Sequence, residues 1–163
     1  MSLSLALPIR LPMKDGFTVH FQEVVHYPEF GVADTFQGEL AFRMPDLLRI
    51  VVTAPEPGSI WVKGDTAWIL QEGQLQQVES PVPPGLFLLE QADSFHRTEN
   101  GVVLRYSSRL SPYLDSARLW LNERGVPESL RLWTPEAVFD FRFSSFTPRP
   151  LAPAAFRPPV VSR

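Results

Sequence analysis

The sequence of 163 residues contains no cysteine, and it has only three histidines and nine glycines. The missing cysteines exclude disulfide bonds, thiolate metal ligands and a cysteine nucleophile. No apolar run approaches the ~18 to 20 residues that a membrane-spanning helix needs. The sequence also lacks a Gly-rich phosphate loop and a G-x-S-x-G motif, so neither nucleotide chemistry nor a typical serine hydrolase is indicated.

The histidines show no spacing typical of a metal site. His20 and His26 are not arranged as H-x-H or H-x-x-x-H, and His96 stands alone. The strand pattern suggests no acidic partner in register with them. We therefore expect no catalytic residue, no metal site and no cofactor. A hydrolase that uses His20 is the enzymatic alternative.

Charge and composition narrow the choice of partners. The net charge of -3 argues against nucleic acid, because proteins that bind it usually carry a basic patch. Apolar residues make up 44% of the chain and charged residues 20%, an ordinary composition for a globular domain. We expect one domain over residues 1–163, and a monomer.

Residues 36–70 alternate in polarity and show no helical stripe. Apolar residues or glycine recur at every second position from Phe36 to Phe42, which predicts a strand with one apolar face. Further strands are predicted over residues 47–53, 59–63 and 66–70. The last two flank a two-residue Gly64-Asp65 turn, which is a strong hairpin signature. Four strands joined by short turns predict an antiparallel meander.

The rest of the chain is also rich in short strands. They are predicted over residues 17–25, 74–78, 102–107, 117–121, 128–134 and 137–146. Residues 26–35 are interpreted as a connecting loop, and residues 1–16 as an extended arm. Residues 148–163 form a Pro-rich, extended C-terminal segment with Phe156 as its apolar anchor. About ten strands predict a mainly β fold, either a barrel or a strongly curved antiparallel sheet.

Residues 84–93 differ in kind from these strands. Prolines precede an unbroken apolar cluster at residues 86–89, and residues 90–93 favour a helix over a strand. A short helix that is apolar on most sides packs between two surfaces or covers an apolar opening. A core-plugging helix and a movable lid therefore both remain open.

The order of motifs in residues 36–70 resembles that of the LolA/LolB-like family of lipoprotein carriers. The motif residues are Gly38, Leu40, Phe42, Pro45, Arg49, Pro55, Ile60, Gly64, Asp65 and Trp68. The resemblance extends over residues 17–160, through Phe17, Phe21 and Gln22 at the start and Ala152, Phe156, Pro158 and Pro159 at the end.

This resemblance implies an incomplete antiparallel barrel around an apolar cavity, lidded by helices. It also implies a periplasmic or otherwise extracytoplasmic protein that carries lipoprotein acyl chains or another lipid, with an export leader once present before Met1. Members of this fold also act as sensors. An envelope-stress sensor or protein-interaction module, with an envelope protein as its partner, is therefore the alternative.

Two features depart from the family pattern. Pro8 and Pro12 interrupt the region of the family's first helix. Met44 stands where the carriers have an arginine that latches the lid, immediately before the corner Pro45. Arg43 is one residue earlier, and a one-residue offset turns a strand side chain to the other face. The latch role is therefore not assigned to Arg43.

Strand parity predicts which side chains would line the cavity. The predicted lining is Leu40, Phe42, Leu48, Ile50, Val52, Trp68, Leu70, Phe139, Phe141 and Phe143, and the predicted lid is Leu86, Phe87 and Leu89. An apolar lining suits a lipid, because each methylene moved out of water gains about 0.8 kcal/mol. Such a carrier needs no specific polar contact.

Overall fold

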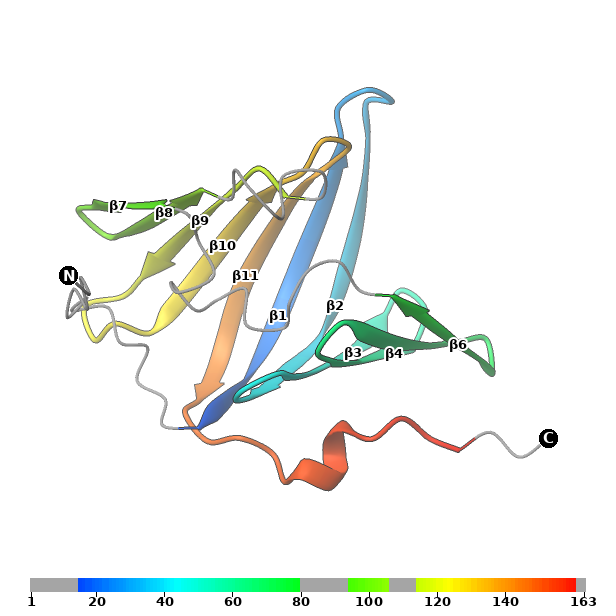
Figure 1. Ribbon diagram of the computed structural model, residues 1–163. Helices are drawn as coiled ribbons and strands as arrows, with labels where there is room; N and C mark the ends of the chain where they lie inside the picture. Colours follow the sequence, from blue (N-terminus) through cyan, green and yellow to red (C-terminus); the bar gives the residue numbers. More distant parts are fainter. Residues whose placement is uncertain (1–14, 80–93, 106–113, 161–163) are drawn as a thin grey trace.

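One curved antiparallel sheet makes up most of the molecule (Figure 1). The structure is a computed structural model, and it describes residues 15–79, 94–105 and 114–160. The strands are β1 (Gly16–Tyr27), β2 (Val32–Arg43), β3 (Leu47–Ala54), β4 (Gly58–Lys63), β5 (Thr66–Gln71), β6 (Gln74–Glu79), β7 (Ser94–Thr98), β8 (Gly101–Arg105), β9 (Ser116–Leu121), β10 (Pro127–Trp133) and β11 (Val138–Thr147).

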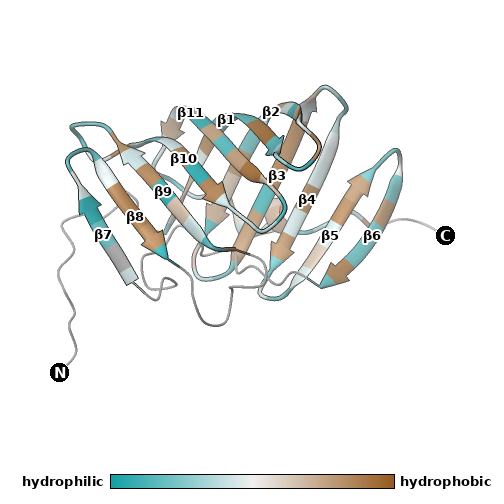
Figure 2. Cartoon of the chain, turned by 90° about the horizontal axis from the view of Figure 1, so that it is seen from above, coloured by the Kyte–Doolittle hydropathy of each residue, from teal (hydrophilic) through white to brown (hydrophobic). Residues whose placement is uncertain are grey.

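The strand order is β6-β5-β4-β3-β2-β1-β11-β10-β9-β8-β7, so the first and last strands of the chain pair at the centre. Figure 2 shows the resulting arch, with β6 and β7 at its two unpaired ends. The sheet is curved and does not close into a barrel. The prediction of a mainly β, incomplete antiparallel barrel of about ten strands is confirmed.

Helix is almost absent from the described residues. The helical element there is the 3-10 turn η3 (Pro153–Phe156). Within these ranges, no helix has the length and apolar character that crossing a membrane requires. The helix predicted over residues 84–93 lies outside the described residues, as does nearly all of the predicted arm.

Strand pairing determines which side chains share a face, because residues directly opposite in a ladder point to the same side. Phe21 of β1 lies opposite both Gly38 of β2 and Phe143 of β11. We call the face that carries these residues the inner face, and the opposite face the outer face. The even positions of β1, such as His20 and Gln22, belong to the outer face.

Two apolar clusters cover the inner face. The first contains the buried residues Phe17, Val19, Phe21, Leu40 and Phe42. The second contains the buried residues Val102, Leu104, Leu114, Ala117, Leu119 and Leu130. Phe141 and Phe143 pack against both clusters, so β11 joins the two halves of the core.

The inner face is the concave one. Leu40 of β2 and Leu119 of β9 line the same small cavity of about 10 Å³. Four strand spacings separate β2 from β9, a distance of roughly 19 Å in a flat sheet. The sheet must therefore curl strongly to bring these two leucines together.

Gly38 lies where β2 and β3 approach most closely. The register shifts between Gln37 and Gly38, which marks a bulge. A Cβ at Gly38 would collide with the carbonyl oxygen of Val51 and would lie 3.0 Å from Cζ of Phe21. The missing side chain thus lets β3 approach from one side and the ring of Phe21 from the other.

The sequence-based prediction was wrong about one loop and missed one strand. The predicted loop over residues 26–35 is shorter, because β1 continues to Tyr27 and β2 begins at Val32. These hairpin ends pair with each other beyond the apolar core, so ladder hydrogen bonds extend the strands where the apolar pattern fades. Strand β7 was not predicted, and it forms the edge next to β8.

The C-terminal segment packs against the sheet through η3. Phe156 is buried, with 4% of its surface exposed, as expected for a side chain that anchors this segment. The turn η3 contacts β3. Arg43 Nη1 donates a hydrogen bond to the carbonyl oxygen of Leu151 at 3.0 Å. The arginine nearest to the family's latch position therefore holds the C-terminal segment in this chain.

Candidate functional site

The inner face brings together most of the predicted lining. The strand register places Leu40, Phe42, Leu48, Ile50, Val52, Phe139, Phe141 and Phe143 on this face. Leu40 and Phe42 are buried, whereas the other six are half-buried. A half-buried apolar side chain keeps surface that another apolar group can cover. The predicted lid residues Leu86, Phe87 and Leu89 lie outside the described residues.

Trp68 and Leu70 lie on the outer face instead. Trp68 is opposite Trp61, which is opposite Arg49 on β3. Strand β5 presents Ala67 and Ile69 to the inner face. The sequence did not distinguish the two faces of β5, because both of its parities carry apolar residues. Trp68 and Leu70 therefore leave the proposed lining.

A row of isoleucines extends the inner face toward its β6 edge. Ile50 of β3, Ile60 of β4 and Ile69 of β5 are consecutive partners across three strands, and all three are half-buried. Ile60 and Ile69 were absent from the predicted lining. Their faces follow from their pairing with Ile50, which the sequence pattern assigned correctly.

The other half of the inner face was also missed as lining. It consists of Val102 and the leucines of β8, β9 and β10, with Leu104, Leu119 and Leu130 among its buried members. Their period-two alternation was visible in the sequence. The alternation alone does not show that these strands curl toward β2.

Glu23 is an unexpected member of the inner face. It lies directly opposite Phe36 on β2 and Phe141 on β11. Its carboxyl has no ion-pair partner among the described side chains, whereas His20, His26 and Arg131 each have one. Burial against apolar neighbours disfavours the charged form and raises the pKa of Glu23 from 4.5 to about 7. The parity that Glu23 shares with Phe17 and Phe21 in the sequence already indicated its place on this face.

The raised pKa of Glu23 predicts a pH dependence of stability. The folded state binds the proton more tightly than the unfolded state, so the contribution of Glu23 is greatest below pH 4.5 and is lost as pH rises toward about 7. Glu23→Gln should therefore unfold at higher denaturant concentration than wild type at pH 8. After allowance for partial exposure, we expect a gain on the order of 1–3 kcal/mol.

Urea titrations of both proteins from pH 5 to pH 8.5 measure this effect. The difference in unfolding free energy should shrink toward zero at pH 5, where the carboxyl is protonated in the folded protein. A difference that stays constant over this range would show that Glu23 does not titrate in the way burial requires.

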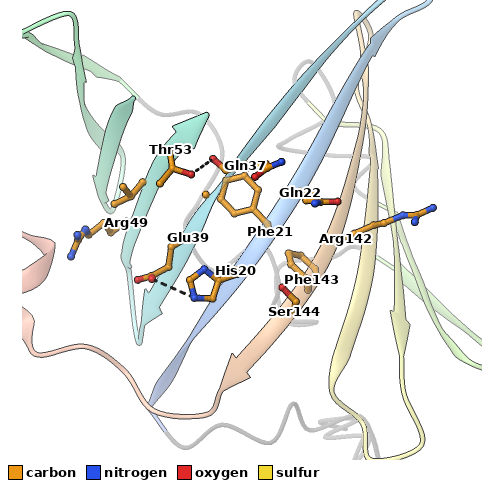
Figure 3. Close-up of a pocket in the computed structure, with 12 residues that line it drawn as sticks. His20, Phe21, Gln22, Gln37, Glu39, Arg49, Thr53, Arg142, Phe143 and Ser144 are labelled. Carbon is orange, nitrogen blue, oxygen red and sulfur yellow. Dashed lines mark hydrogen bonds and ion pairs between the residues drawn. The ribbon is translucent and has the colours of Figure 1, made fainter. Parts of the chain in front are cut away.

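The outer face carries a polar groove of about 470 Å³ over β1, β2, β3 and β11 (Figure 3). His20 lies in register with Glu39 on β2 and with Ser144 on β11. The expectation that His20 has no acidic partner in register was therefore wrong, because this partner comes from another strand. His20 Nε2 is 3.9 Å from Glu39 Oε2, and the two side chains are 58% and 38% exposed. That separation is too long for a hydrogen bond.

A second outer-face groove, also of about 470 Å³, lies over β1, β10 and β11, and Trp120 of β9 and Thr35 of β2 also line it. Asp140 accepts hydrogen bonds from Arg131, with the Nη2–Oδ2 distance at 3.0 Å, and pairs with His26 at 3.2 Å. The guanidinium of Arg118 lies 4.6 Å from the ring centroid of Trp120. The outer face is thus polar and aromatic, and no group of three or more potential metal ligands occurs in the described part of the chain.

Comparisons with known proteins agree with this architecture. The family described as "Outer membrane lipoprotein carrier protein LolA" matches residues 13–158. A LolA superfamily protein from Nitrosomonas europaea has a similar structure, with a TM-score of 0.53 and 15% identity over 92% of this chain and 93% of that chain. A putative outer membrane lipoprotein-sorting protein domain from Vibrio parahaemolyticus gives a TM-score of 0.50 and 8% identity, over 89% of this chain and 91% of that chain. No curated protein matches the sequence. At these identities, the structural likeness shows the shared fold alone.

Proposed function

The chain belongs to the LolA family, and on this premise we propose that it binds lipoprotein acyl chains, or another lipid, against its inner face. We infer that this activity takes place in the periplasm or another extracytoplasmic compartment. The protein is, on this hypothesis, a carrier or binding protein and not an enzyme. The separation of His20 from Glu39 and the exposure of both side chains support that choice.

The observation that carries the proposal is the half-buried apolar surface of the inner face. Ile50, Ile60 and Ile69 form one row of it, and Phe139, Phe141 and Phe143 form another along β11. A long acyl chain laid against such a surface leaves water at a gain of about 0.8 kcal/mol per methylene. A curved sheet surrounds a flexible chain on several sides, which increases the area that each methylene buries.

Neighbouring residues on β5 provide a matched test. Ile69 faces the inner side and Leu70 the outer side, and both are half-buried. We expect Ile69→Asp to weaken binding of a fluorescent long-chain alcohol by about tenfold or more, because an unpaired charge in an apolar site costs several kcal/mol. Leu70→Asp should stay within about twofold of wild type.

Fluorescence titration measures these affinities, and circular dichroism checks that both variants fold. Lipid that co-purifies with wild type in native mass spectrometry would support the same conclusion. If both variants lose binding equally, the inner face is rejected as the binding surface. If wild type binds neither the alcohol nor the same chain with a charged head group at micromolar concentration, the carrier function itself is rejected.

The alternative is a sensor or protein-interaction module on the same scaffold. The groove over β1, β10 and β11 favours it, because tryptophan and arginine side chains such as Trp120 and Arg131 are enriched where proteins meet. Failure of lipid binding, with the fold intact, would make an envelope protein docked on this groove the better hypothesis.

A further inference from the structure

A single carboxyl group interrupts an otherwise apolar row on the inner face. Consecutive partners across β2, β1, β11, β10, β9 and β8 are Phe36, Glu23, Phe141, Leu130, Leu119 and Val102. Five of these six side chains are apolar, and Glu23 is the one that ionises. Glu23 lies on the central strand of the curved sheet, where the two halves of the core meet.

The neighbours of Glu23 leave its hydrogen-bonding capacity unused. Along β1, the adjacent inner-face residues are Phe21 and Val25, and both are buried. On β11 the facing residues are phenylalanines, and on β2 the nearest titratable group on this face is the exposed Asp34, opposite Val25. No cationic side chain among the described residues of β2 and β11 shares this face near Glu23.

Glu23 is half-buried, and a carboxyl without a partner among the described residues destabilises a folded protein to the extent that apolar neighbours replace the water that would solvate it. Burial accordingly raises the pKa of Glu23 to about 7. Leucine or phenylalanine at this position would avoid that cost. Its place in the apolar row is explained if a bound molecule supplies the missing donor.

We propose that Glu23 recognises the polar head of the bound lipid, so that the preferred ligand is a long-chain molecule whose head is an ammonium or another N–H donor. This inference rests on the proposed lipid-binding function and specifies its ligand class. The chain of the lipid lies on the apolar residues beside Glu23, and the head donates to its carboxylate oxygens. A free fatty acid is disfavoured, because its own carboxylate would be placed against that of Glu23.

Three probes with the same alkyl chain and the same fluorophore at the tail separate these effects. One ends in an ammonium group, one in a carboxylate and one in a hydroxyl. Affinities are measured at pH 8.5 for wild type, Glu23→Gln and Glu39→Gln. Glu39→Gln is the matched control, because it removes the same charge from the outer face of the neighbouring strand.

For wild type we expect the ammonium probe to bind about tenfold or more tightly than the carboxylate probe, the usual size of a charge-assisted hydrogen bond. Glu23→Gln should reduce this ratio to within about twofold, whereas Glu39→Gln should leave it unchanged. Lowering the pH from 8.5 to 5.5 should also reduce the ratio in wild type, because the carboxylate of Glu23 takes up a proton.

The hydroxyl probe distinguishes failure of this inference from failure of the proposed function. If wild type binds the hydroxyl probe but shows no preference between the charged probes, head recognition by Glu23 is overturned and lipid binding stands. A ratio reduced equally by Glu23→Gln and Glu39→Gln would also overturn it, since the preference would then come from net charge. If wild type binds none of the three probes, the lipid-binding function itself is rejected.

Discussion

Gly38→Ala should destabilise the protein by about 3 kcal/mol or more, although it adds a single methyl group. The added Cβ would collide with the carbonyl oxygen of Val51 on β3, and it would also lie only 3.0 Å from Cζ of Phe21. Backbone atoms cannot rotate aside as a flexible side chain can. The variant must therefore separate β2 from β3 or shift Phe21 out of the first apolar cluster.

Gly58→Ala is the control for this prediction. Gly58 lies in β4 of the same sheet, and a Cβ there would meet the carbonyl oxygen of Leu70 at an ordinary 3.4 Å. We expect its unfolding free energy to stay within about 1 kcal/mol of wild type. Urea denaturation followed by tryptophan fluorescence measures both variants. Equal midpoints for Gly38→Ala and wild type would mean that the close approach of β2 and β3 is not needed.

Phe141→Ala should cost about 3 kcal/mol, because Phe141 packs against both apolar clusters. Its ring lies edge-on to Phe21, with 5.9 Å between the ring centroids, and stacks on Phe143 at 6.1 Å. Removing the ring takes contacts from β1 on one side and from β10 on the other. The loss should therefore loosen the junction between the two halves of the arch.

Phe30→Ala is the matched control, since Phe30 is 73% exposed in the turn between β1 and β2. We expect it to change the unfolding free energy by less than about 0.5 kcal/mol. Chemical denaturation of both variants gives the comparison. If Phe141→Ala is no more destabilising than Phe30→Ala, the two clusters do not depend on β11 for their connection.

Several features of the fold were readable from the sequence because strand side chains alternate with a period of two. This alternation placed Leu40, Phe42, Phe141 and Phe143 on apolar faces, and the structure has them on the inner face. The Gly64-Asp65 turn likewise predicted the β4–β5 hairpin, and Gly64 has the positive φ of 57° that such a turn requires. These signals are local, so they can be read from the sequence without knowing which strands are neighbours.

Pairing between strands that are far apart in the sequence determined the features that the local pattern left undecided. Both parities of β5 carry apolar residues, so only the pairing of Ile69 with Ile60, and of Ile60 with Ile50, decides that Trp68 points outward. The pairing of His20 with Glu39 likewise depends on the register of β1 against β2. No local pattern contains such a register, because it is set by the whole ladder.

The environment of Glu23 is likewise determined partly by the local sequence and partly by the tertiary structure. The sequence by itself determined that Glu23 shares a face with Phe21, because the two are separated by two positions in a strand. Only the tertiary structure decided that Glu23 lies between apolar side chains, since Phe36 and Phe141 come from strands on either side. Desolvation depends on what surrounds a carboxyl in space, and residues more than a hundred positions apart in the chain supply those surroundings here.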